Sequence, residues 1–212
     1  MSYITYPKYC SQQGFTLIEI AVGLVIIGLV VSSFITPISS LSDTARRSTV
    51  DNMLDDIHDA MIGFAINNSG RLPCPATTSS NGLENWTGSA CAQEHGFVPA
   101  ASLGLQGRYG ENNLINDPWG NPYRYSFSET SAYQICTQDA CPNAASVLSS
   151  GIAAVLVSTG TDGIAGSASA DQLENTDGDN RFVRQIFREG TNAFDDHIRW
   201  ISPNTLTLYL TR

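Results

Sequence analysis

The sequence contains few basic residues and only one lysine, Lys8. Its 11 basic residues stand against 20 acidic ones, which gives a formal net charge of −9 over 212 residues. Proteins that bind nucleic acid neutralise phosphates with clustered lysine and arginine, so this composition argues against a nucleic-acid partner. His58, His95 and His197 have no zinc-ligand spacing with one another or with the cysteines.

Sequence signatures of the common enzyme classes are also missing. The chain has no GxSxG nucleophile elbow, no phosphate-binding P-loop and no dinucleotide-binding fingerprint. Gly160, Gly163 and Gly166 form a GxxGxxG pattern, which differs from that fingerprint and lies in a turn-rich loop. We therefore expect a protein that is not an enzyme.

One long apolar run is present, from Phe15 to Ile35. Its 21 residues contain a single charge, Glu19, and at about 1.5 Å per residue such a helix spans a hydrocarbon core of roughly 30 Å. A secretory signal peptide needs a basic n-region, and here only Lys8 precedes the run. A plain membrane anchor and a helix whose Glu19 has a partner in an assembly remain, because a carboxylate inside a membrane costs several kcal/mol.

The residues Gly14-Phe15-Thr16-Leu17-Ile18-Glu19, followed by the apolar run, resemble the processing signature of type IV prepilins and type II secretion pseudopilins. The resemblance implies that a prepilin peptidase cuts after Gly14 and that Phe15 becomes the methylated N-terminus. It also implies that Glu19 meets the N-terminal amine of a neighbouring subunit in the filament. A buried carboxylate and a buried ammonium each require the other.

Apolar residues become periodic after the run, at i, i+4, i+7, i+11 and i+14: Val50, Leu54, Ile57, Met61 and Phe64. This spacing predicts an amphipathic helical face, and Asn67-Asn68-Ser69-Gly70 predicts its end. One helix of about 50 residues follows. We expect four segments, which are a leader (1–14), a transmembrane and filament-core helix (15–37), an amphipathic helix (38–66) and a globular head stapled by disulfides (67–212).

Cys10 precedes the apolar run, and Cys74, Cys91, Cys136 and Cys141 follow it. If the run crosses a membrane, the last four lie on one side, and an even set on an exported domain indicates two disulfides. Of the three pairings, proximity favours Cys74–Cys91 and Cys136–Cys141, each worth roughly 2–4 kcal/mol. The alternative is buried, reduced thiols in a cytosolic protein.

Strand patterns follow in the last hundred residues. Tyr123–Phe127 and Tyr133–Thr137 alternate with aromatics, and Gly151–Ser158 is a continuous apolar run typical of a buried central strand. Ile198–Ser202 and Leu206–Leu210 predict a final hairpin. The fold class is therefore α+β, with the long N-terminal helix packed on a small antiparallel sheet, as in the pilin fold that the resemblance implies.

A second resemblance lies in the head. Asp117-Pro118-Trp119-Gly120-Asn121-Pro122-Tyr123 resembles a stretch of major pseudopilins, and Leu156–Gly166 resembles the strand and loop that carry a calcium site in those proteins. Calcium takes six to eight oxygen ligands, and acidic residues are dense between Thr159 and His197. The resemblance favours Ca²⁺ held by Asp162, Asp195 and Asp196. The alternative is a solvated acidic loop.

These observations predict a structural subunit that enters the bacterial inner membrane with a single span and then joins a periplasmic or cell-surface filament. The implied partners are other copies or related pilins, the prepilin peptidase and the inner-membrane assembly platform. The long connection from Arg71 to Asn116 favours a type IV pilin-like subunit, major or minor. The stretch at residues 117–123 supports the alternative, a type II secretion pseudopilin. An alternative of another class is a membrane-anchored periplasmic binding protein or enzyme that never polymerises.

Overall fold

A computed structural model describes residues 14–163, 169–190 and 192–210, and for residues 33–41 it describes the backbone only. The leader expected at residues 1–14 therefore lies, apart from Gly14, outside the described residues, as does Cys10. The chain divides into two compact units, one ending at Ala45 and one beginning at Arg46. Each unit is described by itself.

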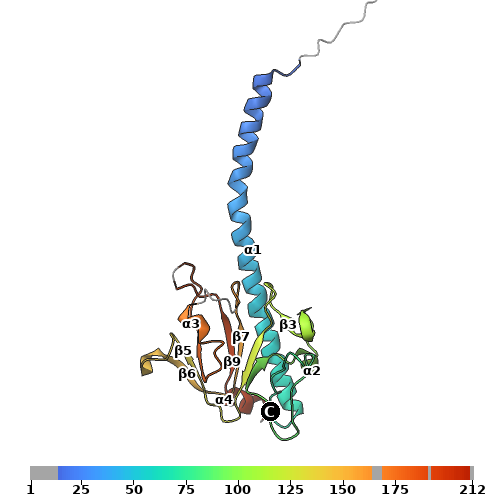
Figure 1. The fold of residues 1–212 in the computed structure, drawn as a ribbon, viewed down its shortest axis with the longest axis vertical. Coiled ribbons are helices and arrows are strands. Elements are labelled where there is room, and N and C mark those ends of the chain that lie inside the picture. Colours follow the sequence, from blue (N-terminus) through green and yellow to red (C-terminus); the bar gives the residue numbers. More distant parts are fainter. Residues whose placement is uncertain (1–13, 164–168, 191, 211–212) are drawn as a thin grey trace, which may run out of the picture. The chain divides into compact units, whose positions relative to one another are not determined.

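The first helix, α1, is continuous from Leu17 to Asn67 and has 51 residues, in agreement with the expected length of about 50 (Figure 1). It runs through Pro37 and through the boundary between the two units. The remaining elements follow in this order: β1 (His95–Phe97), α2 (Ala100–Leu103), β2 (Arg108–Tyr109), η1 (Glu111–Asn113), β3 (Ile115–Asn116), β4 (Arg124–Phe127), β5 (Tyr133–Cys136), η2 (Ala144–Ser146), β6 (Val147–Ile152), β7 (Ala154–Ser158), α3 (Ala170–Leu173), β8 (Arg181–Val183), β9 (His197–Ile201) and α4 (Pro203–Leu210).

The second unit has three layers, and β7 lies in the middle one. An antiparallel sheet of order β1-β4-β7-β9 separates α1 from a smaller sheet of order β6-β5-β8 (Figure 1). Leu156 packs in the core that includes Leu54 and Ile57 of α1. Val155 and Val157 pack in a second core with the smaller sheet. Because both faces of β7 are covered, its sequence is apolar throughout rather than alternating.

The helical face predicted from periodicity is the face that packs on this sheet. Val50, Leu54, Ile57 and Met61 are fully buried, and Phe64, one turn further, is partly exposed. The α+β class is thus confirmed, with a long N-terminal helix packed on an antiparallel sheet.

One prediction about strands is wrong. The last segment is the helix α4 rather than the second strand of a hairpin, because Ser202-Pro203 starts a helix. The Ser202 hydroxyl accepts a hydrogen bond from the Thr205 N–H at 3.3 Å, and proline is favoured at the first helical position. The smaller sheet, which was not predicted from the sequence, contains one parallel pair, β5 with β8.

Candidate processing, assembly and cation sites

The helix α1 begins at a capping box formed by Thr16 and Glu19. The Glu19 N–H donates to the Thr16 hydroxyl at 3.3 Å, and the Thr16 N–H donates to a Glu19 carboxylate oxygen at 3.4 Å. This reciprocal pair satisfies two backbone donors that a helix start leaves free. Thr-x-x-Glu ahead of an apolar run is the sequence signal for this capping box. The carboxylate therefore faces the start of its own helix, next to Phe15.

Apolar side chains of the first unit are uncovered. Every large apolar side chain from residue 15 to residue 31 is more than half exposed. No helix among the described residues is long and apolar enough to cross a membrane. An apolar surface of this extent is rare on a soluble monomer and marks an interaction surface.

Asp117 joins the turn after β3 to the central strand. Its side chain is almost fully buried, and its Oδ1 accepts hydrogen bonds from the N–H groups of Trp119, Gly120 and Asn121 at 2.9–3.0 Å. Its Oδ2 accepts a hydrogen bond from the Ser158 hydroxyl at 2.8 Å. Burial raises the pKa of Asp117, and these hydrogen bonds act in the opposite direction. The turn is thereby fixed against the end of β7.

The loop after β7 is held against Asp195. The Asn121 amide donates to the Gly160 carbonyl at 2.7 Å, and the Thr161 N–H donates to Asp195 Oδ2 at 2.6 Å. Gly160 has φ +61°, and a Cβ there would lie 2.5 Å from Asp195 Cγ. Only glycine combines this conformation with so close an approach, so Gly160 allows the loop to reach Asp195.

Amide side chains hold the three carboxylates predicted to bind calcium. The Gln172 Nε2 donates to Asp195 at 2.5 Å and to Asp162 at 3.3 Å. The Asn175 Nδ2 donates to Asp196 Oδ2 at 2.7 Å. Asp162 and Asp195 thus accept hydrogen bonds from one amide and Asp196 from a second one, and the oxygens of the three carboxylates do not all lie within 4.8 Å of one another.

Asp196 is the most perturbed of these groups. Its side chain is buried, and its Oδ1 has no hydrogen-bond partner among the described residues. Burial raises the pKa of Asp196 to about 8, with smaller contributions of the same sign from Asp195 and Asp162. Burial and Asp195 also raise the pKa of Asp162. A cation beside these carboxylates would favour their ionised forms and so oppose the rise in their pKa values.

The buried amides Gln172 and Asn175 were not predicted from the sequence. Gln172 lies in α3, and Asn175 lies two residues after its end. The helix α3 begins at a second capping box, formed by Ser169 and Gln172. The pattern Ser-x-x-Gln is visible in the sequence and predicts only a helix start. Nothing in the spacing shows that the Gln172 amide also reaches two distant carboxylates.

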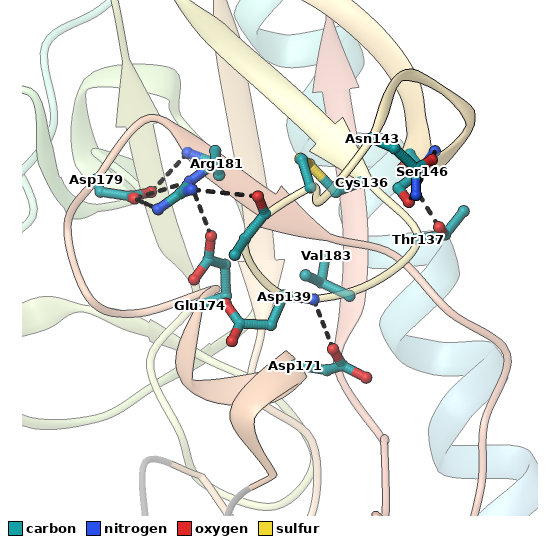
Figure 2. Close-up of a disulfide and its surroundings, with 12 residues drawn as sticks. Cys136, Thr137, Asp139, Asn143, Ser146, Asp171, Glu174, Asp179, Arg181 and Val183 are labelled. Atoms are coloured by element: carbon teal, nitrogen blue, oxygen red, sulfur yellow. Dashed lines mark hydrogen bonds and ion pairs between the residues drawn. A yellow bond between two sulfur atoms is a disulfide. The ribbon is translucent and has the colours of Figure 1, made fainter.

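A separate acidic cluster surrounds Arg181. Among the described residues, Glu174, Asp177 and Asp179 are the one group of three whose acidic oxygens lie within 4.8 Å of one another. The Arg181 guanidinium lies 2.7 Å from Asp179 and 3.1 Å from Glu174, and Asp139 lies beside Glu174 (Figure 2). Burial raises the pKa of Glu174 to about 7, and Asp139 and Asp179 add to the shift. Since Arg181 already supplies a cation, we assign no metal to this cluster.

Glu174→Gln is expected to flatten the pH dependence of stability between pH 4.5 and pH 7. The pKa of Glu174 lies above its ordinary value of 4.5, so its stabilising contribution is present below pH 4.5 and is lost as the pH rises through about 7. The loss is on the order of 3 kcal/mol. Urea unfolding at a series of pH values measures it. The exposed Glu129→Gln is the control, and an unchanged slope in Glu174→Gln would refute the assignment.

Disulfides close two loops of the second unit. Cys74 is joined to Cys91 and Cys136 to Cys141, with Cα–Cα distances of 5.2 and 5.6 Å, and Figure 2 shows the bond at Cys136. These are the pairs that proximity in the sequence favoured. The first disulfide closes part of the long connection after α1, whose start is further fixed by the ion pair of Arg71 with Glu84 at 2.8 Å.

Comparison with known proteins gives matches at the N-terminus and across half of the chain. The family described as the prokaryotic N-terminal methylation motif matches residues 10–35. The type II secretion system core protein G of Klebsiella michiganensis is 32% identical over 114 residues, which cover 54% of this chain and 72% of that protein. The protein of the same name from Klebsiella pneumoniae is 31% identical over 113 residues, which cover 53% and 73%. No solved structure matches significantly.

Proposed function

Since the chain belongs to the family of type IV pilins and type II secretion pseudopilins, we propose that a prepilin peptidase processes it at Gly14. The chain is a structural subunit of an extracytoplasmic filament and assembles with related subunits. The methylation motif at residues 10–35 carries the proposal, because it includes Gly14, Phe15 and Glu19. In this proposal Phe15 is the mature, methylated N-terminus, and the Glu19 carboxylate meets the amine of a neighbouring subunit.

Before assembly, the apolar run holds the subunit in the inner membrane with a single span, where the assembly platform takes it up. Support comes from the 21 residues with one charge and from the uncovered apolar side chains up to residue 31. Hydrocarbon and neighbouring helices would each cover them. In this proposal residues 15–37 form the membrane and filament-core segment, residues 38–66 the amphipathic segment, and residues 67–212 the head.

Our first proposal is that the filament resembles a type IV pilus. The connection from Arg71 to Asn116 supports it. Its disulfide and its Arg71–Glu84 ion pair give the head a rigid surface feature. A type II secretion pseudopilus is the second candidate, and the two relatives named core protein G favour it. Both candidates use the same processing and assembly chemistry.

Deletion of the gene, with complementation by the intact chain, separates these candidates. The first proposal expects loss of surface filaments from sheared cells and unchanged secretion of exported enzymes. The second expects loss of secretion instead. Intact filaments together with intact secretion would contradict both.

We further propose that Asp162, in the loop after β7, binds Ca²⁺ together with Asp195 and Asp196, which directly precede β9. The unpartnered, buried Asp196 Oδ1 supports the proposal, because a buried carboxylate oxygen without a donor is costly. Calcium accepts oxygen ligands from flexible loops at variable geometry. When bound, the ion would supply charge neutralisation that Gln172 and Asn175 provide only through amide hydrogen bonds.

Removal of calcium is expected to lower the melting temperature of the unit from Arg46 onward by about 5–10 °C. This corresponds to a ligand at about 100 times its Kd, which adds about 2.7 kcal/mol, and to 2–4 °C per kcal/mol for a domain of this size. Thermal unfolding in EDTA and in excess Ca²⁺ measures it. Asp196→Asn is the control and should not respond to EDTA. An unchanged wild-type melting temperature in EDTA would contradict the site.

A further inference from the structure

The loop from Arg184 to Glu189 presents an apolar tip beside an unpaired cation. Ile186 is 81% exposed and Phe187 44% exposed. The exposed Arg184 guanidinium lies over the Trp200 ring, 5.4 Å from its centroid. No carboxylate among the described residues pairs with Arg184. Arginine and large apolar side chains together are typical of the centres of protein interfaces.

Contacts on both sides hold this loop in place. The Gln185 amide donates to the Thr137 carbonyl and to Asp171, each at 2.6 Å. The Arg47 guanidinium of α1 lies 3.1 Å from the centroid of the Phe187 ring. A tip that is already ordered loses less conformational entropy when it binds. The exposure of Ile186 is thus a feature of a fixed surface.

A complementary surface lies on α1. Asp56, Asp59, Gly63 and Ile66 follow one another at i, i+3, i+7 and i+10 and therefore share one helix face. The Asp59 side chain is 84% exposed and Ile66 is 51% exposed. Asp56 is exposed and has no partner among the described residues. This face offers two carboxylates followed by apolar surface.

Gly63 has no packing role in its own chain. A Cβ added there would meet nothing within 4 Å, yet glycine inside a helix costs about 0.5–1 kcal/mol relative to alanine. Folding of the single chain therefore gives no reason for it. An absent side chain on an exposed helix face allows another backbone or a bulky side chain to come close.

The loop and the helix face are two different patches of one molecule. The loop and β9 contact α1 along a stripe at i, i+4 and i+8, namely Arg47, Asp51 and Asp55. Asp59 and Gly63 continue this row at i+12 and i+16, and because each step of four residues turns by about 40°, they lie roughly 40° and 80° around the helix axis beyond Asp55. A contact between two different patches on identical subunits is heterologous and, when it does not close a ring, builds an open helical filament.

We propose that the loop Arg184–Glu189 of one subunit binds the Asp56–Ile66 face of α1 on a second copy in the filament. Arg184 pairs with Asp56 or Asp59, and Ile186 packs over Gly63 against Ile66. Opposite charges and apolar surface match in the same order on both sides. This inference rests on the proposed filament function. A lipid surface is the competing occupant for the same tip.

Charge exchange tests the contact in cells that produce the full chain with its assembly system. Arg184→Glu and Asp59→Arg are each expected to lower filament yield about tenfold, the effect of 1.4 kcal/mol on a subunit contact. The double variant is expected to recover most of the yield. Arg184 and Asp59 are both exposed, so the melting temperature of each variant should stay within the wild-type range.

Cysteine cross-linking tests the proximity directly. Ile186→Cys combined with Gly63→Cys is expected to give covalent dimers and longer ladders in oxidised filaments, and each single variant should give none. Ile186→Cys with Glu129→Cys is the control pair.

Filaments that form without cross-links, or a double charge variant that stays at the single-variant yield, would overturn the contact and leave the filament function standing. If the chain binds anionic vesicles, Arg184→Glu abolishes that binding and no cross-links form, the loop binds lipid instead. A wild-type chain that forms no filaments would overturn the function itself.

Discussion

Glu19→Ala is expected to leave the chain in the membrane fraction but to remove it from filaments. The reason is electrostatic, because a methylated N-terminal amine buried among neighbouring helices needs a counter-charge, and removing one partner of a buried ion pair costs about 3–5 kcal/mol. That cost corresponds to a loss of more than a hundredfold in assembled subunits. Immunoblots of membrane and sheared-filament fractions measure the two populations.

Glu19→Gln separates the capping role that the structure shows for this side chain from the proposed role of its charge in assembly. Glutamine retains the capping hydrogen bond to the Thr16 N–H, which Glu19 makes at 3.4 Å, but it carries no charge. If Glu19 acts through its charge, glutamine fails in assembly as alanine does. If normal filaments form from either variant, the carboxylate serves only as a helix cap and the proposed ion pair is wrong.

Asp117→Ala is expected to lower the stability of the second unit by about 3–5 kcal/mol. The substitution leaves the three N–H groups of the turn and the Ser158 hydroxyl without the acceptor they have at 2.8–3.0 Å. Each unsatisfied buried group costs about 1–3 kcal/mol, and the losses are not fully additive. At 2–4 °C per kcal/mol, the melting temperature should fall by about 10 °C or more in a thermal unfolding scan.

Asp117→Asn is the matched variant. Its side-chain carbonyl still accepts the three N–H groups, and its amide donates to Ser158, so most of the hydrogen bonds survive. Because burial raises the pKa of Asp117, loss of the charge itself should cost little. A fall as large as that of the alanine variant would show that the charge, rather than the acceptor geometry, stabilises the turn.

The long helix and the central strand were predictable because their signals are local. Val50, Leu54, Ile57 and Met61 recur with helical period and lie buried on the sheet. The continuous apolar run of β7 identified a strand covered on both faces. The final helix α4 was missed because Leu206, Leu208 and Leu210 alternate as in a strand, while the cap formed by Ser202 lies outside that pattern. Local propensity at the helix start prevailed over the alternation.

The candidate sites also differ in whether their sequence signals are local. The motif at Gly14, Phe15 and Glu19 is contiguous, so the sequence alone located it. The carboxylates Asp162 and Asp195 are 33 positions apart, and only the fold shows that Gln172 bridges them. The contact also depends on Gly160, whose missing Cβ makes room for Asp195. Long-range polar contacts of this kind leave no periodicity in a sequence.

Mass spectrometry of the mature protein from filaments or membranes tests the central claim most directly. The account predicts an N-terminal peptide that begins at Phe15 and carries one added methyl group, with residues 1–14 absent. A Gly14→Leu variant, made in parallel, should retain the leader. A mature N-terminus at any residue other than a methylated Phe15 would contradict the assignment of this chain as a processed filament subunit.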